Sequence, residues 1–265
     1  MKVSIVTPSF NSAHTIQHTI DSVAHQSYPH IEYIVIDGGS TDGTVDILRA
    51  YDHLISYWIS APDKGIYDAM NKGISKATGD IIAIINSDDF YVHAEVIKRV
   101  VQQFKRTKVD SVYGDLQYVA PEDTSRVIRH WASGKFKREN FLYGWMPPHP
   151  AFFVKRKVYE SFGLFDTRLK TSADYELMLR FLYKNNISSH YLDELLVRMR
   201  AGGASNQSWY NRIKANLEDR RAWEINNLQP YFFTALLKPA RKINQYFARY
   251  KVEVEPWQTK RLEKA

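Results

Sequence analysis

The sequence predicts an α/β fold, with a doubly wound, largely parallel sheet followed by a C-terminal helical extension. Short apolar segments alternate with amphipathic helical patterns through the first hundred residues, and this alternation favours parallel strands joined by crossover helices. Residues 81–85 form an unbroken apolar run, mostly β-branched, which is typical of a strand buried on both faces. After residue 206 the patterns are helical only.

The elements of the first part follow one another in strand–helix order. The predicted strands cover residues 3–6, 31–36, 56–60 and 81–85, and the predicted helices cover residues 15–26, 44–50, 66–76 and 94–106. We expect Asn11 or Ser12 to cap the first helix, because short polar side chains accept hydrogen bonds from the free amides of a first turn.

The middle of the chain is less regular. Its predicted strands cover residues 111–113 and 151–154, and its predicted helices cover residues 155–162 and 175–184. A loop at 201–206 contains two adjacent glycines and separates this part from the tail. We therefore expect one domain at residues 1–205, with halves at 1–108 and 109–205, and an extension at 206–265.

Composition places the chain among globular proteins with a substantial core. It has 265 residues, of which 44% are hydrophobic and 25% charged. No apolar run is long enough to span a membrane, and Met1-Lys2 leads directly into the first strand rather than into a signal peptide. A cytoplasmic location is therefore expected. The absence of cysteine excludes disulfides, thiolate metal sites and cysteine nucleophiles.

Positive charge is concentrated in the tail. From Trp209 onward there are twelve basic and six acidic residues, so the tail carries most of the net charge of +7. Such a tail suits nucleic acid, anionic lipid or an acidic partner. No nucleic-acid-binding motif accompanies it, so we expect no nucleic-acid partner.

Polar residues follow three of the predicted parallel strands. They are Thr7-Pro8, Asp37 and the sequence Asn86-Ser87-Asp88-Asp89. The carboxyl ends of parallel strands meet at one sheet edge, where ligands bind in open α/β folds. The hard oxygens of Asp88 and Asp89 suit Mg²⁺ or Mn²⁺ beside a phosphate, although Asn-Ser-Asp-Asp is also ordinary turn composition.

The glycine-rich segment at residues 37–43 would let the backbone approach a base or ribose. It is not a phosphate-binding P-loop, because no Gly-Lys-Ser/Thr follows, and the first strand lacks a dinucleotide fingerprint. The alternative is a capped turn before the helix at 44–50.

Four motifs together resemble family 2 glycosyltransferases, which are inverting enzymes that build polysaccharides and glycolipids. The motifs are VSIVTPSFN at 3–11, IDGGSTDGT at 36–44, PDKGIYDAMNKGI at 62–74 and NSDD at 86–89. Their order and spacing match the family from about residue 1 to 196. The resemblance implies a GT-A fold, with a Rossmann-like, mostly parallel sheet flanked by helices. It assigns nucleotide-sugar binding to residues 1–108 and the acceptor and catalysis to residues 109–205.

The resemblance also implies roles for the donor-side residues. Thr7, Pro8 and Phe10 would line the nucleotide base, and Asp37 would accept a hydrogen bond from the base, commonly uracil. Asp63 and Lys64 would lie near the base and ribose.

The segment Asn86-Ser87-Asp88 occupies the family's Asp-x-Asp position, which holds a divalent cation on the donor diphosphate. The resemblance implies Mn²⁺ or Mg²⁺, with Asp88 as the first ligand and Asp89 as a substitute. Asn86 replaces the first acid of the motif. Its neutral amide would still touch ribose but would bind metal more weakly.

Asp174 matches the position of the family's catalytic base, which takes a proton from the acceptor hydroxyl. Thr171-Ser172-Ala173-Asp174 is also a capping-box pattern, so a structural role for Asp174 is the alternative. His149 would be a further metal ligand or a contact to acceptor or diphosphate, or else a partly buried histidine in a loop held by prolines.

Aromatic residues raise two more hypotheses. Tyr143 and Trp145 would either stack on an acceptor sugar or pack in the core. In the tail, residues 230–251 combine aromatic and aliphatic positions at helical spacing with interleaved lysine and arginine, and Pro239 interrupts the pattern. Such a segment suits the surface of an anionic membrane. Packing on the domain or a subunit contact is the alternative.

The sequence therefore predicts a metal-dependent inverting glycosyltransferase, of the hexosyl or N-acetylhexosaminyl type. It would take a UDP- or GDP-sugar and act on a glycan or lipid-linked acceptor in bacterial surface polysaccharide synthesis, at the inner face of the cell membrane. The alternatives are a nucleotidyltransferase of similar fold, and a degenerate protein that only binds a nucleotide-sugar or docks on a membrane. The first is disfavoured because residues 9–14 contain neither glycine nor lysine.

Overall fold

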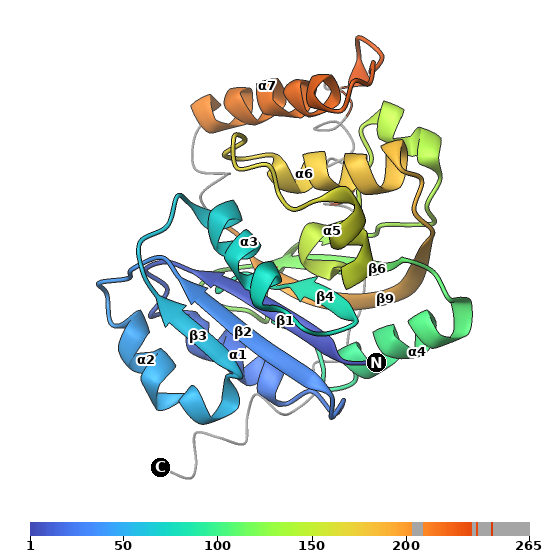
Figure 1. Cartoon of the computed structure of the whole chain (residues 1–265). Helices are drawn as coiled ribbons and strands as arrows, with labels where there is room; N and C mark the ends of the chain where they lie inside the picture. Colours follow the sequence, from blue (N-terminus) through green and yellow to red (C-terminus); the bar gives the residue numbers. More distant parts are fainter. Residues whose placement is uncertain (203–208, 235–236, 238–244, 246–265) are drawn as a thin grey trace.

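The computed structural model describes residues 1–202, 209–234, 237 and 245. Within these residues a single mixed sheet is covered by helices on both faces (Figure 1). The sheet has nine strands, eight of them in the order β3-β2-β1-β4-β8-β6-β9-β5, while β7 pairs with β6. The predicted α/β class is therefore confirmed, but the sheet as a whole is mixed, with parallel pairing in the first half and several antiparallel pairs in the second.

The first half contributes four parallel strands and the helices that connect them. The strands are β1 (Val3–Ser9), β2 (Ile31–Asp37), β3 (Tyr57–Ser60) and β4 (Ile81–Ile84). The connecting elements are α1 (Ile16–Ala24), α2 (Thr44–Ala50), the 3₁₀ turn η1 (Asp52–Leu54) and α3 (Ile66–Lys76). Because β2 and β4 flank β1 in parallel, their carboxyl ends lie side by side.

The second half extends the same sheet in mixed orientation. Its strands are β5 (Asp89–Tyr91), β6 (Ser111–Val119), β7 (Val127–Trp131), β8 (Phe152–Lys155) and β9 (Ser189–Arg200). Its helical elements are α4 (Val96–Thr107), η2 (Arg138–Tyr143), η3 (His149–Ala151), α5 (Arg156–Phe162), α6 (Ala173–Met178), η4 (Leu179–Lys184) and α7 (Trp209–Ile225). β6 and β9 run parallel, whereas β8 is antiparallel to both β4 and β6.

The apolar run at residues 81–85 is buried on both faces, as predicted. Ile82 and Ile84 of β4 point into one core, which also contains buried residues of α3, α5, α6 and α7. Ile81 and Ala83 point into the other core, which contains buried residues of α1, α2 and α4. Alternate residues of one strand therefore serve both layers.

Several element predictions are corrected by the structure. β5, β7, β9 and most of β6 have no predicted counterpart, and the single helix expected at 175–184 is α6 followed by a π-helical turn, η4. β9 contains helix-forming leucine, methionine, glutamate and arginine, but it pairs with β6 on one side and β5 on the other. Tertiary pairing overrides local propensity there. The first helix has Thr15 at its N-cap without a side-chain hydrogen bond, so neither Asn11 nor Ser12 caps it.

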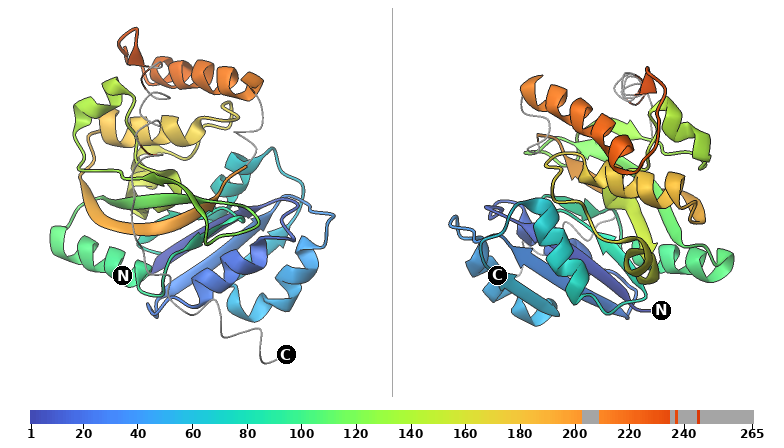
Figure 2. Two further views of the ribbon diagram at one scale, coloured as in Figure 1. Left: turned by 180° about the vertical axis from the view of Figure 1, so that it is seen from behind. Right: turned by 45° about the horizontal axis from the view of Figure 1, so that its top comes forward.

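The described part of the extension packs on the domain. Helix α7 lies beside α6 in all the ribbon views (Figures 1 and 2). Among the described residues, no helix combines the length and hydrophobicity needed to cross a membrane. Most of the predicted membrane-binding segment, including Pro239, lies outside the described residues.

Candidate active site

Three predicted strand ends converge at the carboxyl edge of the sheet. Ser9 at the end of β1 pairs with Asp37 at the end of β2. On the other side, the amide of Ile85 donates to the carbonyl of Val6 at 3.0 Å. Beyond the strands, the hydroxyls of Ser12 and Ser87 are 2.7 Å apart. The loops after β1, β2 and β4 therefore form one surface.

The Asp37 carboxylate organises the glycine-rich loop. It is fully buried and accepts hydrogen bonds from the amides of Gly39 and Ser40, at 3.1 and 2.9 Å. It also accepts from the hydroxyls of Ser40 and Ser60. Four donors match the capacity of a carboxylate, so Asp37 holds the turn between β2 and α2 in place. A direct contact with a base stays a prediction.

Phe10 and Asp63 approach each other over Gly38 at this edge of the sheet. A Cβ atom added to Gly38 would lie 2.7 Å from Oδ2 of Asp63 and 3.3 Å from the Phe10 ring. Phe10 is 63% exposed. Asp63 uses Oδ1 to accept from the Gly65 amide at 2.7 Å. An exposed ring and a carboxylate therefore face each other across a glycine, which suits a flat polar ligand.

The remaining donor-side residues take different positions. The Thr7 hydroxyl is buried and accepts a hydrogen bond from Tyr33 at 3.1 Å, so this side chain does not reach the exposed edge. Pro8 is buried within β1. Lys64 is exposed, and its amide donates to Asp68 at 3.1 Å.

The acidic segment after β4 is more buried than a simple turn. Asp89 lies beyond β4, as the sequence predicts, but it begins β5 and is fully buried. It is enclosed because β5 pairs with β9 at Met199. Oδ2 of Asp89 accepts from the Asn86 amide at 3.0 Å. Asp88 is only half-buried, so it is the acid that reaches the site surface.

Burial raises the pKa of both acids. For Asp89 the pKa is raised well above its ordinary value by burial and then by the charge of Asp88, against the opposing effects of Asn86 and Arg200. For Asp88 burial raises the pKa, and Arg200 opposes the shift. A bound cation would favour the ionised form of Asp88.

Arg200 and His18 support this segment, and the sequence analysis missed both. Arg200 donates to the backbone oxygen of Asp88 at 2.6 Å, and its guanidinium lies 2.6 Å from Nδ1 of His18. Burial, followed by the charge of Arg200, lowers the pKa of His18 to about 4. His18 is therefore neutral at pH 7. No sequence motif connects these residues, which are brought together because β9 pairs with β5 and α1 packs against β5.

The oxygen atoms of this segment fit a divalent cation that is held partly by the substrate. The carboxylate of Asp88 is a hard oxygen ligand at the site surface. The buried Oδ1 atoms of Asn86 and Asp89 have no hydrogen-bond partner among the described residues. Mg²⁺ commonly takes one or two carboxylates and completes its shell with phosphates and water. Across residues 1–202 and 209–234, however, no three acidic or histidine residues gather as a cation site. Asp88, Asp89 and His149 therefore do not gather into one cation site, and the role of each stays a prediction.

The candidate base Asp174 lies at the start of α6, beside the N-terminus of α3. Its Oδ1 is 3.3 Å from the Tyr67 hydroxyl and accepts from the Tyr175 amide at 2.8 Å. The capping box, which is the structural alternative for Asp174, does not form, because the N-cap is Ser172 and makes no side-chain hydrogen bond to the helix. Burial raises the pKa of Tyr67 well above its ordinary value, and the charge of Asp174 adds to this. Tyr67 therefore stays protonated and can donate to Asp174.

His149 belongs to the same cluster as Asp174. Its ring lies edge-on to Phe165 at 5.4 Å, and Phe165 stacks on Tyr67 at 5.6 Å. Burial lowers the pKa of His149, and the charge of Asp174 opposes the shift. The histidine is therefore neutral at pH 7 and lies within electrostatic range of Asp174.

The two aromatic candidates for stacking on an acceptor sugar lie in different environments. Trp145 is 7% exposed and donates from its indole nitrogen to the Ser133 carbonyl at 2.8 Å, so it packs in the core. Tyr143 is 47% exposed and lies against Tyr231 and Phe233 of the segment after α7.

One side chain connects the acid segment with the base. The pKa of Tyr118 on β6 is raised by burial and by the charges of both Asp89 and Asp174, while Arg129 lowers it. Tyr118 therefore lies within electrostatic range of both acids.

The comparisons with known proteins agree with this geometry. Residues 4–162 match the family model for glycosyl transferase family 2. An uncharacterized glycosyltransferase of Mycobacterium tuberculosis strain H37Rv is 35% identical over 182 residues, which cover 67% of this chain and 68% of that protein. A PGL/p-HBAD biosynthesis glycosyltransferase of Mycobacterium bovis is 29% identical over 210 residues, covering 77% of this chain and 78% of the relative.

Solved structures show the same fold. Residues 1–349 of TarS from S. aureus, in complex with UDP-GlcNAc, superpose with a TM-score of 0.69 at 19% identity, covering 93% of this chain and 73% of TarS 1–349. The mannosyltransferase PcManGT from Pyrobaculum calidifontis, in complex with GDP-Man and Mn²⁺, gives 0.64 at 18% identity, covering 95% and 76%. With the motifs, the GT-A sheet and the family match in agreement, the chain belongs to glycosyl transferase family 2.

Proposed function

We propose that this chain transfers a sugar from a UDP- or GDP-sugar to a hydroxyl of a glycan or lipid-linked acceptor, with inversion at the anomeric carbon. One observation carries the proposal. The segment at the start of α3 places Asp63 at the donor edge and Tyr67 against the candidate base Asp174. Donor and base are therefore positioned by the same short stretch of chain.

The donor side would bind the nucleotide at the loops after β1, β2 and β3. Phe10 offers an exposed ring to the base, and Oδ2 of Asp63 offers a hydrogen-bond acceptor across Gly38. Asp37 shapes the loop that closes this edge. In this proposal residues 1–108 bind the donor, residues 109–205 hold the base and acceptor, and residues 206–265 form the extension.

The diphosphate would lie beside the segment after β4. Asp88 is its proposed cation ligand, with the oxygens of Asn86 and Asp89 behind it. When bound there, Mn²⁺ or Mg²⁺ stabilises the charge of the departing nucleoside diphosphate. The Mn²⁺ complex of PcManGT supports this assignment.

Asp174 would act as the general base. Its carboxylate takes the proton of the acceptor hydroxyl, the acceptor oxygen bonds to the anomeric carbon, and the bond from that carbon to phosphate breaks. The nucleoside diphosphate leaves with the bonding electrons. Because attack and departure take place on opposite faces in one displacement, the anomeric configuration inverts. The Tyr67 hydroxyl holds Asp174 in place until the acceptor arrives.

A lipid-linked acceptor is supported by two observations. A relative has a name that places it in PGL/p-HBAD biosynthesis. The exposed aromatic side chains Tyr143, Tyr231 and Phe232 gather where η2 meets the segment after α7, and the basic part of the tail follows in sequence. We propose peripheral contact of this face with the anionic inner surface of the cell membrane.

Thermal stabilisation by a panel of nucleotide-sugars tests the function. UDP-GlcNAc, UDP-glucose, UDP-galactose and GDP-mannose would each be added with and without Mn²⁺, followed by assay of UDP or GDP release. We expect a Mn²⁺-dependent shift with one donor, about 2.7 kcal/mol when the donor is at a hundred times its Kd. A shift without release over long incubation would favour the degenerate binding protein. The absence of any shift would contradict the proposal.

A further inference from the structure

A carboxylate from the C-terminal helix gathers the backbone just before the candidate base. Oε2 of Glu218, on α7, accepts hydrogen bonds from the amides of Lys170, Thr171 and Ser172, at 3.0, 2.7 and 3.1 Å. It also accepts from the Thr171 hydroxyl at 2.7 Å. Three consecutive amides and a hydroxyl therefore converge on one oxygen, two residues before Asp174.

The position of Glu218 favours its charged form and a fixed geometry. The side chain is 9% exposed. Burial works to raise its pKa, but the hydrogen bonds from Thr171, Lys170 and Ser172 outweigh that effect, so the net pKa is lowered. Hydrogen bonds to an ionised acceptor are about twice as strong as neutral ones. The carboxylate therefore fixes this backbone more firmly than an ordinary cap.

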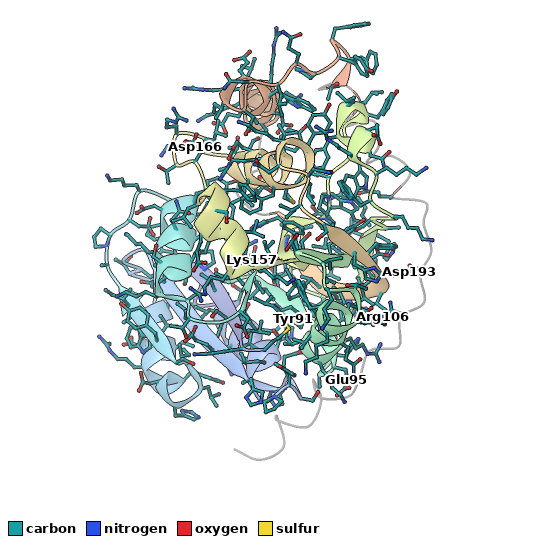
Figure 3. The ribbon with its side chains drawn as sticks, turned by 45° about the vertical axis from the view of Figure 1, so that its right-hand side comes forward. Tyr91, Glu95, Arg106, Lys157, Asp166 and Asp193 are labelled. Atoms are coloured by element: carbon teal, nitrogen blue, oxygen red, sulfur yellow. The ribbon has the colours of Figure 1, made fainter. Side chains whose placement is uncertain are left out.

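The opposite end of the same loop is fixed to α3. The Asn71 side-chain amide donates to the Phe165 carbonyl at 2.9 Å, and its oxygen accepts from the Phe165 amide at 2.9 Å. Figure 3 shows Asp166 on this loop, beside α6. The loop thus has one anchor on α3, next to Tyr67, and one on α7. Asp174 follows directly from the second anchor.

We propose that Glu218 is a positioning residue, which sets the place of Asp174 against Tyr67 and the acceptor, and that α7 therefore belongs to the catalytic apparatus. This inference rests on the proposed role of Asp174 as the base. It assigns a function in the reaction to a helix outside the residues that match the family model.

The test compares Glu218→Ala and Glu218→Gln with the wild-type full-length chain. The probe is the nucleotide-sugar that gives the largest thermal shift, and the readout is its Mn²⁺-dependent hydrolysis. We expect Glu218→Ala to lower kcat by about 10- to 100-fold, because small displacements of a catalytic group have effects of this size. The KM for the donor should change less than kcat, since the hydrogen bonds of Glu218 go to residues 170–172, next to Asp174.

Glutamine provides the conservative rescue. Its amide oxygen can take the place of Oε2, where all four donors converge. Glu218→Gln should therefore recover kcat to within about threefold of wild type, as the oxygen retains most hydrogen bonds while losing the charge. If Glu218→Ala does not fold, Glu218→Asp replaces it, because the shortened carboxylate cannot reach all four donors.

Asn226→Ala is the matched control. Asn226 also joins the C-terminal segment to α6, through a hydrogen bond of 2.9 Å to Glu176, but it does not touch residues 170–172. Both variants should lower the melting temperature, while only Glu218→Ala should lower kcat at 20 °C. Equal kcat losses in the two variants, or an unchanged kcat in Glu218→Ala, would overturn the inference and leave the proposed function intact. A wild-type chain that binds no donor would overturn both.

Discussion

Asp37 and Asp174 are both assigned to the proposed site, yet they are held in place in different ways. The backbone donors to Asp37 lie two and three residues away in its own loop, and a serine of the neighbouring parallel strand completes the set. Asp174 instead meets Tyr67, which is 107 positions earlier in the chain, and follows a segment anchored by Glu218 from α7. The donor half is built from local loops at strand ends, whereas the base depends on three distant elements.

Because of this difference, substitutions in the two halves should have different effects. A local loop at a strand end keeps its shape as long as the strand is buried, because the donors and the acceptor are near neighbours in sequence. A base assembled from α3, α6 and α7 loses its geometry when any one of them shifts. Changes in the acceptor half should therefore affect turnover more than binding, and changes in the donor half should affect binding first.

The largest expected effect comes from removing the base. Asp174→Asn keeps the shape of the side chain but cannot take the acceptor proton, so kcat should fall by about 10²- to 10⁴-fold. The donor-induced thermal shift should persist, because Asp174 lies outside the donor edge. Nucleoside diphosphate release and thermal shift measured on the same samples check both statements. Asp123→Asn, in the turn between β6 and β7, is the control. Full turnover by Asp174→Asn would show that Asp174 is not the base, and the contrast with the donor half would then not hold.

The next largest effect is expected at Asp88. Asp88→Ala removes the acid that reaches the site surface, and turnover should fall by about 10²- to 10³-fold because the leaving diphosphate loses electrostatic stabilisation. The part of the donor-induced shift that depends on Mn²⁺ should disappear, which Asp174→Asn should not cause. Asp46→Asn, an exposed acid paired with Arg49, serves as the control. A Mn²⁺ response retained in Asp88→Ala would show that Asp89 or another group is the ligand.

The same contrast explains which features could be predicted from the sequence. The strand end at Asp37 and the polar segment that contains Asp88 follow from apolar runs that stop at polar residues, and parallel strands then bring them together. Burial of Asp89 could not be predicted, because it depends on β9, whose residues have helix-forming propensity. The contact between Tyr67 and Asp174 had a partial signal, since Tyr67 lies within a recognised motif, but nothing in that motif names its partner.

Arg200 and Glu218 carried no signal at all. Each acts through backbone groups of a distant segment: Arg200 donates to the carbonyl of Asp88, and Glu218 accepts from amides at 170–172. Contacts to backbone require no particular residue type at the other end. A sequence motif therefore identifies the residues that meet the substrate more readily than those that position them.

A smaller effect is expected at Gly38, in the proposed pocket for the nucleotide base. In Gly38→Ala the new methyl group would lie 2.7 Å from Oδ2 of Asp63, so that flexible carboxylate must move. Donor affinity should fall by about tenfold, which corresponds to 1.4 kcal/mol, with kcat nearly unchanged. Titration of the preferred donor by thermal shift measures its affinity, and steady-state kinetics measure kcat. A loss of kcat at constant affinity would contradict the local construction of the donor half.

The smallest effect on activity is expected at Glu32, which resembles Glu218 in gathering donors from other segments. Glu32 accepts from Lys2, Ser4 and Thr78, and although burial acts to raise its pKa, these hydrogen bonds lower it to about 2. It lies near the start of β2, five residues and roughly 16 Å of strand before Asp37. Glu32 therefore fastens the far end of the sheet, whereas Glu218 fastens the base.

The pH dependence of stability tests this distinction. Because the pKa of Glu32 is lower in the folded chain than its ordinary 4.5, its contribution is fully present above pH 4.5 and is lost as the pH falls toward 2. Glu32→Gln should reduce the free energy of unfolding at pH 7 by about 1–3 kcal/mol and flatten its decline between pH 5 and 3. Urea unfolding at several pH values measures both. Donor turnover at pH 7 should match wild type, since a carboxylate that fastens only the scaffold affects stability alone. A loss of kcat like that expected for Glu218→Ala would show that the end of the sheet near Glu32 is coupled to Asp174.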